Sequence, residues 1–305
     1  MNTEFVLLTA IDAPAQAMMT FPKYRPLLYL SEPNVTVVAA RQDGQVIALA
    51  LAVLAGDKAE ILSLYVSTCY RRQGIGRGLL GALEDEMIRR GCSEMGAVWM
   101  NGASGTEGFA ALLHGHQWTL PQPRMIVYRA ELERLSNASW IHAFAHLPIG
   151  HAIVPWIELG TEQLINLKQA IRFEAWVSPE LIPFDFSDQG IDGAPSEKRL
   201  NLAYTVWGEV VGWNFAHHLN TNTARISCTF VRPDSQQQLF MLNLWREVLV
   251  RLVDTEYKTI SWAVFVERSA MINFNDAYMS PYLQQRSETW GSSKVLSSAP
   301  TTIVI

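Results

Sequence analysis

The sequence has few cysteines, little net charge and no long apolar run. Its three cysteines, Cys69, Cys92 and Cys228, fall in no CxxC or metal-ligand spacing, which favours free thiols over a disulfide framework or a zinc site. No apolar stretch approaches the roughly 20 residues that span a bilayer, and the first residues lack the basic region of a secretion signal. We therefore expect a cytoplasmic protein that does not enter a membrane and holds no metal.

Charge of either sign is also scarce. The chain carries a formal charge of -5 over 305 residues, and its pI is near 5.8. Sequence-independent binding to nucleic acid, and binding to an anionic membrane, both need broad basic patches, so neither partner is expected. A local basic cluster could still serve one phosphorylated ligand. The oligomeric state stays open.

What the sequence does have is enough apolar material for substantial cores. Hydrophobic residues make up 49% of the chain and charged residues only 17%, as in globular proteins. The length favours roughly two domains. A polar stretch separates two halves that both begin with a strand, so we predict a first domain at 1–132, a linker at 133–150 and a second domain at 151–305.

The first half is expected to begin as an antiparallel sheet. Val35–Arg41 and Gln45–Val53 are apolar, β-branched runs, and Gln42-Asp43-Gly44 between them is typical of a hairpin turn with glycine at positive φ. A third strand follows at Glu60–Val66. Further elements are expected as a helix from Leu79, a strand at 97–100, a short helix at 108–114 and a strand at 125–132. Together they predict a mixed α/β fold.

The second half repeats this order of elements. A shift of 165 residues aligns apolar positions of the third strand and the following helix without a gap. The aligned pairs include Val66 with Val231, Leu79 with Leu244 and Leu83 with Val248. In the loop, however, Gly74 meets Leu239 and Gly76 meets Met241. The pattern predicts a duplicated fold whose second copy has lost its loop chemistry, and chance agreement of two strand-then-helix segments is the alternative.

One motif carries chemistry, the Gly-rich and Arg-rich loop 71–78 between a strand and a helix. The first N–H groups of a helix lack intrahelical partners and lie at its positive end, so such a loop binds anions. Gly74 and Gly76 let the backbone approach phosphate oxygens, and arginines pair well with them. A Walker lysine is absent, and a hairpin precedes the loop, so both nucleotide folds are disfavoured. A plain tight turn is the remaining alternative.

The spacing Arg71-x-x-Gly74-x-Gly76, after a strand ending at Val66 and before a leucine-rich helix, resembles the signature of the GNAT superfamily, the Gcn5-related N-acetyltransferases. The resemblance covers about residues 4 to 132 and is only architectural for the second half. It implies two tandem GNAT-like acyl-CoA N-acyltransferase domains of mixed α/β class, the second degenerate. It also implies acetyl-CoA or a related acyl-CoA as co-substrate, no metal, and direct transfer to a primary amine of a small molecule or peptide.

The resemblance further implies which residues contact the acyl-CoA. The pyrophosphate would lie on the loop 71–78, and the backbone of the splayed strand end 64–66 would pair with the pantetheine arm. Asn101 matches another contact position, with a plain turn residue as the alternative. The implied set is Leu64, Tyr65, Val66, Arg71, Arg72, Gln73, Gly74, Ile75, Gly76, Arg77, Gly78 and Asn101.

The catalytic acid of the family is missing or displaced. Members often carry a tyrosine five residues before an aromatic residue that ends the last helix, and if Trp118 is that aromatic, the position holds Leu113. His114 or His116 could substitute, although histidines near a helix end more often cap it or face solvent. Glu60 could order a water as general base, with an exposed strand-end glutamate as the alternative.

Two other functions stay open at this stage. A non-catalytic acyl-CoA sensor or scaffold is favoured by the leucine at position 113. A different ligand-binding protein, with its site between two domains, would bind no CoA at all. The acceptor cannot be read from the sequence, since the acidic balance gives only a slight preference for cationic amines.

Overall fold

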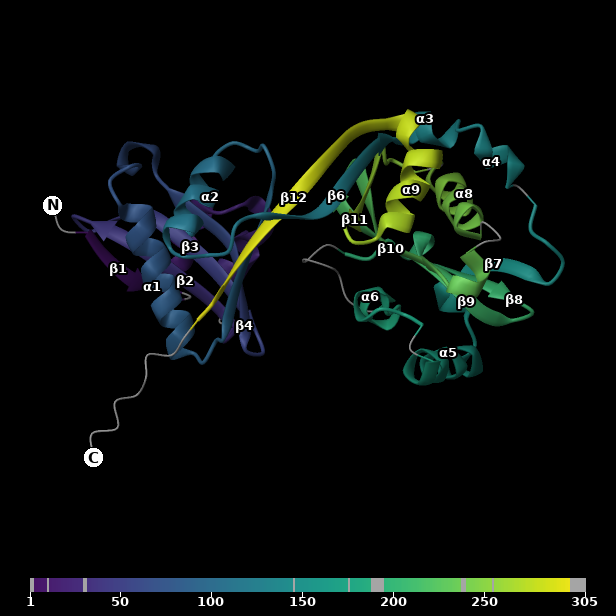
Figure 1. Ribbon diagram of the computed structural model, residues 1–305, viewed down its shortest axis with the longest axis horizontal. Helices are drawn as coiled ribbons and strands as arrows, with labels where there is room; N and C mark the ends of the chain where they lie inside the picture. Colours follow the sequence, from purple (N-terminus) through teal and green to yellow (C-terminus); the bar gives the residue numbers. More distant parts are fainter. Residues whose placement is uncertain are drawn as a thin grey trace. The chain divides into compact units, whose positions relative to one another are not determined.

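The computed structural model describes residues 3–9, 11–29, 32–144, 146–174, 176–187, 195–236, 240–253 and 255–296 (Figure 1). The chain divides into two compact units. Unit 1 comprises Met1–Arg124 and Glu288–Ile305, and unit 2 comprises Met125–Ser287. Within the described residues, no helix is both long and apolar enough to cross a membrane.

Unit 1 is built on a mixed sheet with the strand order β1-β2-β3-β4-β5-β12. The first four strands are antiparallel neighbours, β5 is parallel to β4, and β12 is antiparallel to β5. Its strands are β1 (Thr3–Leu7), β2 (Val35–Gln42), β3 (Gln45–Ala55), β4 (Lys58–Val66), β5 (Glu94–Met100) and β12 (Leu283–Val295). Its helices are η1 (Ala13–Met19), η2 (Pro22–Tyr29), η3 (Thr68–Tyr70), α1 (Ile75–Arg89) and α2 (Thr106–Gly115). The predicted hairpin is confirmed, with φ of 51° at Asp43 and 80° at Gly44.

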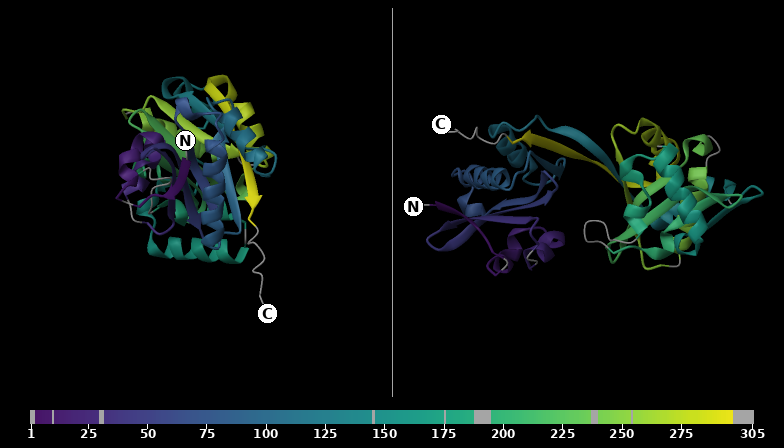
Figure 2. Two further views of the ribbon diagram at one scale, coloured as in Figure 1. Left: turned by 90° about the vertical axis from the view of Figure 1, so that its left-hand side faces the viewer. Right: turned by 90° about the horizontal axis from the view of Figure 1, so that it is seen from below.

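The two faces of this sheet pack against different helices because β3 alternates alanine and leucine. Ala48, Ala50 and Ala52 lie in one core with the apolar face of α1, whereas Leu49 and Leu51 pack with η1 and η2. Figure 2 shows α1 on one side of the sheet and the two 3-10 helices on the other. The small alanines let α1 lie close to the strands, so the start of α1 is fixed relative to the end of β4.

Unit 2 repeats the architecture with the strand order β6-β11-β10-β9-β8-β7. Its strands are β6 (Gln122–Glu131), β7 (His151–Pro155), β8 (Leu202–Val206), β9 (Glu209–Asn220), β10 (Thr223–Val231) and β11 (Thr259–Phe265). Its α-helices are α3 (Leu132–Ser136), α4 (Trp140–Ala143), α5 (Thr161–Glu174), α6 (Phe184–Ser187), α7 (Pro233–Gln236), α8 (Phe240–Val253) and α9 (Ser269–Tyr278). Its 3-10 helices are η4 (Trp156–Glu158), η5 (Pro179–Leu181), η6 (Lys198–Leu200) and η7 (Ser280–Tyr282).

The internal repeat is confirmed by the bounds of the strands. A shift of 165 residues carries Lys58–Val66 of β4 onto Thr223–Val231 of β10, and Glu94–Met100 of β5 onto Thr259–Phe265 of β11. The parallel pairing has the same register in both units, since Lys58 faces Glu94 and Thr223 faces Thr259. Chance agreement of apolar patterns does not reproduce a pairing register, so the fold is duplicated.

The compact units differ from the domains predicted at 1–132 and 151–305. Residues 289–295 of β12 pair with β5, so the stretch from Glu288 onward belongs to unit 1. Residues 125–131 of β6 pair with β11 and therefore begin unit 2. Backbone partners decide the unit to which a strand belongs, and an apolar pattern along one strand does not identify its partner.

The stretch expected as a linker, 133–150, is packed against unit 2 in its described part. Leu135 and Trp140 are buried in the core of that unit, and the Trp140 Nε1–H donates to the carbonyl oxygen of Tyr278 at 2.9 Å. The side chain of Asn243, in α8, donates to the carbonyl oxygen of Phe144 at 3.1 Å. The polar residues around 134–139 are the outer side of short helices whose apolar residues face inward.

Candidate functional site

In unit 1, β4 and β5 separate partway along their length. Their parallel pairing runs from Lys58 and Glu94 to Ile61 and Ala97, although β4 continues to Val66. The closed end is fastened by an ion pair of 2.8 Å between Lys58 Nζ and Glu94 Oε2, which also lowers the pKa of the glutamate. Beyond the last pair, the edge of β4 is open.

The backbone of this open edge has polar groups that β5 does not use. Ser67 N–H donates to the Ile47 carbonyl oxygen of β3 at 2.9 Å. Because hydrogen-bonded and non-bonded residues alternate along an antiparallel ladder, Val66 and Leu64 turn their N–H and C=O groups away from β3. Tyr65 turns its backbone toward β3. Two of the three predicted strand-end residues therefore present backbone groups to the opening.

The loop after β4 forms a cradle of N–H groups at the start of α1. Gly74 is the N-cap with φ of 81°, and Arg72 also has a left-handed φ of 62°. Left-handed residues in such a turn direct successive N–H groups to one side and create an anion-binding concavity. The N–H groups of Ile75, Gly76 and Arg77 add the donors that every helix start leaves without intrahelical partners. A Cβ placed on Gly74 would meet nothing within 4 Å, so no atom packs against that side of the N-cap residue.

The other two glycines of the loop serve packing. A Cβ on Gly76 would lie in ordinary contact with Leu112 and Val66, at 3.6 and 3.7 Å, so Gly76 does not face the open phosphate space that the sequence suggested. A Cβ on Gly78 would overlap the ring of Phe5 in β1. The N–H of Gly78 donates within the first turn of α1 at 3.1 Å and is not among the open donors. No sequence signal indicated the contact with Phe5.

Two side chains of the predicted loop are turned back onto the chain. Arg71 Nε–H donates to the Val66 carbonyl oxygen at 2.8 Å, and its guanidinium lies 5.9 Å from the ring centre of Tyr65. Gln73 Nε2–H donates to the Cys69 carbonyl oxygen at 3.0 Å. These bonds brace the loop between β4 and α1.

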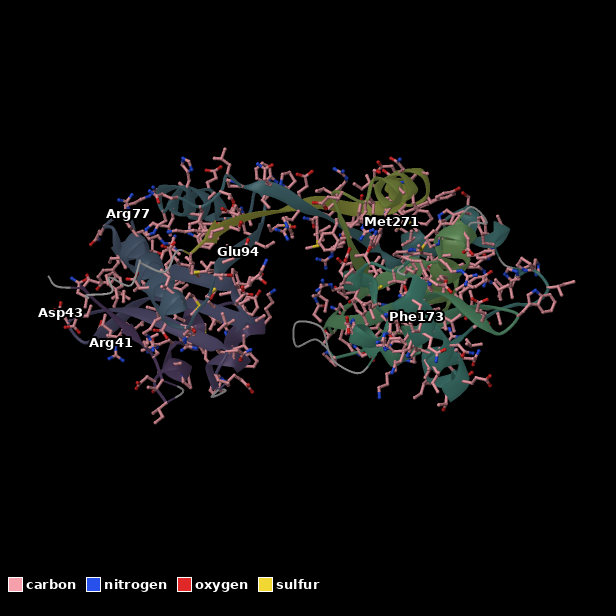
Figure 3. The ribbon with its side chains drawn as sticks, turned by 60° about the horizontal axis from the view of Figure 1, so that its bottom comes forward. Arg41, Asp43, Arg77, Glu94, Phe173 and Met271 are labelled. Carbon is pink, nitrogen blue, oxygen red and sulfur yellow. The ribbon has the colours of Figure 1, made fainter. Side chains whose placement is uncertain are left out.

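The two other arginines of the loop are exposed, as Arg71 is, and the Arg77 Nη2 lies 3.4 Å from the position of a Cβ on Gly115, at the end of α2. Arg72 and Arg77 are both exposed, and Figure 3 shows Arg77 at the surface of unit 1, by the start of α1. The side chain of Ile75 is buried in the core, so this residue can offer only its backbone N–H. Asn101 is exposed in the turn after β5, where its N–H donates to the Glu288 carbonyl oxygen at 2.8 Å.

The predicted acid and base candidates lie in three different surroundings. Leu113 is fully buried, and α2 contains no tyrosine. His114 is exposed near the end of α2. Glu60 is exposed in the paired part of β4, opposite Gly96 of β5 and before the opening.

His116, which follows α2, belongs to a buried polar cluster around Glu84 of α1. Its Nδ1 lies 3.5 Å from Glu84 Oε2, and the same carboxylate accepts hydrogen bonds from Trp118 Nε1 and Lys294 Nζ, both at 2.7 Å. Glu84 is only 7% exposed, so these partners compensate its burial. The cluster fastens β12 to α1. Lys294 was missed because it lies 210 residues from Glu84 along the chain.

Unit 2 has the same strand opening, but its helix start contains no glycine. The first residues of α8, Phe240, Met241 and Leu242, are at most 9% exposed, and Phe240 stacks on Tyr204 with ring centres 4.8 Å apart. Met241, which aligns with Gly76, is thus part of the core. Leu239, which aligns with Gly74, lies outside the described residues. Over the described residues, no group of three or more His, Cys, Asp or Glu side chains could hold a metal ion.

Comparisons with known proteins agree with this architecture. Residues 9–104 match the model of the acetyltransferase (GNAT) family. A tandem GNAT protein from the clavulanic acid biosynthesis pathway superposes with a TM-score of 0.63 at 17% identity, over 98% of this chain and 100% of that one. A GCN5-related N-acetyltransferase from Sphaerobacter thermophilus gives 0.63 at 16% identity, over 96% of both chains. A search of curated protein sequences finds no significant match.

Proposed function

We propose that this chain, whose residues 9–104 match the model of the acetyltransferase (GNAT) family and whose fold over 98% of its length is that of a tandem GNAT protein, is an N-acetyltransferase. It would take acetyl-CoA as donor and a primary amine of a small molecule or peptide as acceptor. One observation carries the proposal: an open strand edge and an open helix start lie next to each other in unit 1, joined by a short loop. Its free thiols, Cys69, Cys92 and Cys228, fit a cytoplasmic location.

The residues of unit 1 fit the two polar parts of acetyl-CoA. The N–H groups of Ile75, Gly76 and Arg77, at the positive end of α1, would bind the pyrophosphate, and the exposed guanidiniums of Arg72 and Arg77 would add charge-assisted bonds. The backbone groups of Leu64 and the N–H of Val66, whose carbonyl oxygen accepts from Arg71, would pair with the amides of the pantetheine arm, as an added strand pairs with a sheet edge. The thioester, when bound, supplies an activated acetyl group.

Unit 2 is proposed to bind no acyl-CoA. The residue that aligns with Gly74, the left-handed N-cap of α1, is Leu239, and an L-residue such as leucine rarely adopts that conformation. This supports one donor site per chain. The role left to unit 2 is to support unit 1 or to contribute to acceptor binding.

Transfer would proceed directly from thioester to amine. The acceptor must be deprotonated, since an ammonium has no lone pair and an alkylamine has a pKa of about 10.4 in water. Holding both reactants in place contributes about 7 to 11 kcal/mol in favourable cases, and a general base adds about 100- to 10,000-fold. Glu60 and His114, both exposed, are the proposed proton acceptors or donors; His116, already engaged by Glu84, is the weaker candidate.

A second function is a non-catalytic acyl-CoA sensor. The observation that favours it is the buried Leu113 in a helix without a tyrosine, which leaves no evident acid for the departing thiolate. Such a protein would still bind acetyl-CoA in unit 1.

The proposal is tested by calorimetric titration with acetyl-CoA, followed by an acetylation assay that measures release of the CoA thiol over a panel of amines. We expect binding that weakens in Arg77→Gln and not in Lys198→Gln, which removes an exposed cation of unit 2. Binding without turnover on any amine favours the sensor. Absence of binding refutes both functions.

A further inference from the structure

We propose that Arg71 is a positioning residue that sets the end of the pantetheine-binding edge, and that its side chain does not bind the pyrophosphate. The inference rests on the proposed function, because it concerns how the same donor site is built. It separates Arg71 from Arg72 and Arg77, the other arginines of the loop, which the sequence presents as one basic cluster.

The first observation is the bond between Arg71 and the strand that precedes it. Its Nε–H donates to the carbonyl oxygen of Val66 at 2.8 Å, five residues earlier in the chain. This carbonyl is one of the groups that turns away from β3 toward the opening between β4 and β5. Arg71 therefore occupies the last acceptor of the open edge, and a ligand pairing along β4 must end its pairing there.

The second observation is the position of the Arg71 guanidinium group. It lies 5.9 Å from the ring centre of Tyr65, a neighbour of Val66 whose ring attracts a cation to its face. One bond and one ring contact together hold the guanidinium against the strand end. Turning it toward a phosphate would break the bond to Val66 and the contact with Tyr65.

The third observation is that further hydrogen bonds hold the loop around Arg71 in place after the end of β4. Arg71 N–H donates to the Thr68 carbonyl oxygen at 3.3 Å, and Gln73 Nε2–H donates to the Cys69 carbonyl oxygen at 3.0 Å. Ser67 N–H is held by β3. The loop thus forms a fixed corner between the open edge of β4 and the cradle at α1. A chain-like ligand that leaves the edge at Val66 arrives directly at the phosphate-binding N–H groups.

These contacts predict that the loss of Arg71 changes the affinity for two ligands differently. Acetyl-CoA uses both the strand edge and the cradle, whereas 3′-phosphoadenosine 5′-diphosphate, which lacks the pantetheine arm, uses the cradle alone. Removing Arg71 should weaken the first ligand and spare the second. Removing Arg77 should weaken both, since it belongs to the first turn of α1, whose N–H groups form the cradle, and its charge would attract the phosphates of either ligand.

The experiment compares Arg71→Ala, Arg72→Ala and Arg77→Ala by calorimetric titration of the full chain with both ligands, and circular dichroism confirms folding. Each variant removes one exposed arginine from the same loop, so the long-range loss of charge is matched. We expect Arg71→Ala to weaken acetyl-CoA about tenfold beyond its effect on the nucleotide, a ratio worth ~1.4 kcal/mol. In Arg77→Ala, both ligands should weaken by the same factor.

Equal weakening of both ligands in Arg71→Ala would make Arg71 a phosphate ligand and overturn the proposal. Unchanged affinity for both would deny Arg71 any role in binding and overturn the proposal as well. If Arg71→Ala unfolds, Arg71→Lys provides the test, since lysine keeps the charge but lacks the planar group that lies over Tyr65, and the same difference between ligands is expected. Failure of the unaltered protein to bind acetyl-CoA would refute the proposed function itself, an outcome separate from the other two.

Discussion

Two glycines of one loop, Gly74 and Gly76, should respond in opposite ways to the same added methyl group. Gly74 has φ of 81°, a conformation that costs an L-residue roughly 1–2 kcal/mol, although no atom obstructs the new Cβ. Gly76 is in the first turn of α1 without a left-handed φ, and its Cβ would make ordinary contacts with Val66 and Leu112. Glycine in a helix costs roughly 0.5–1 kcal/mol relative to alanine.

The expected result is that Gly74→Ala destabilises unit 1 by about 1 kcal/mol, after the loss of unfolded-state entropy offsets part of the strain. Gly76→Ala should be neutral or stabilise it by up to roughly 1 kcal/mol. Because the chain has two units, the unfolding of unit 1 should be measured separately, through hydrogen exchange of peptides from β3 and α1. The predicted difference in the free energy of unfolding between the two variants is therefore roughly 1–2 kcal/mol.

The same two variants also separate the effect of backbone conformation on acetyl-CoA binding from the effect of an added side chain. Gly74→Ala should weaken acetyl-CoA, since relief of the strain reorients the N–H groups of the cradle. Gly76→Ala should bind within about twofold of the unaltered protein, because its Cβ is turned toward Val66 and Leu112. Equal stability of the two variants, or equal loss of affinity, would refute this assignment of roles.

Four further predictions concern the units and their charges. Ending the chain after Ser287 removes residues 289–295, the partners of β5, and should lower the thermal midpoint of unit 1 and abolish acetyl-CoA binding; unchanged melting would contradict the division into units. Calorimetry should give one acetyl-CoA per chain, and two equivalent sites would disprove the proposal that unit 2 binds none. Hydrogen bonds from Arg89 and Arg90 lower the pKa of Glu86 below its ordinary value of 4.5. The stability that these bonds give the folded protein is therefore present above pH 4.5 and is lost as the pH falls through the lowered pKa. Glu86→Gln should therefore be less stable than the unaltered protein at pH 7 by roughly 1–3 kcal/mol in urea unfolding, a difference that narrows under acid, and a constant difference would exclude the linkage. If the protein is an enzyme, Glu60→Gln, His114→Ala and His116→Ala should each lower turnover by no more than about 10,000-fold, and complete loss in one folded variant would identify a dedicated acid or base.

The sequence alone determined the part of this protein that depends on local pattern. The alternating strands around Asp43-Gly44 predict a hairpin because the turn needs positive φ at neighbouring positions. The loop 71–78 predicts an anion site because helix starts leave N–H groups without partners. The repeat at 165 residues predicts a second copy because core positions recur at the same spacing, and the register of β10 with β11 confirms it. The hairpin and the loop are signals within a short stretch of chain, and the repeat is a comparison of two such local patterns.

Only the tertiary structure decided which distant residues share a site. The pairing of β12 with β5 and the burial of Glu84 against Lys294 join residues far apart in sequence, for which one chain gives no pattern. The loop arginines look equivalent in sequence, yet Arg71 reaches back to Val66 and Arg77 lies next to Gly115 of α2. Side-chain direction depends on which partners the fold brings within hydrogen-bonding distance. For that reason the sequence predicts this loop as an anion site, whereas only the fold shows which partners each of its side chains contacts.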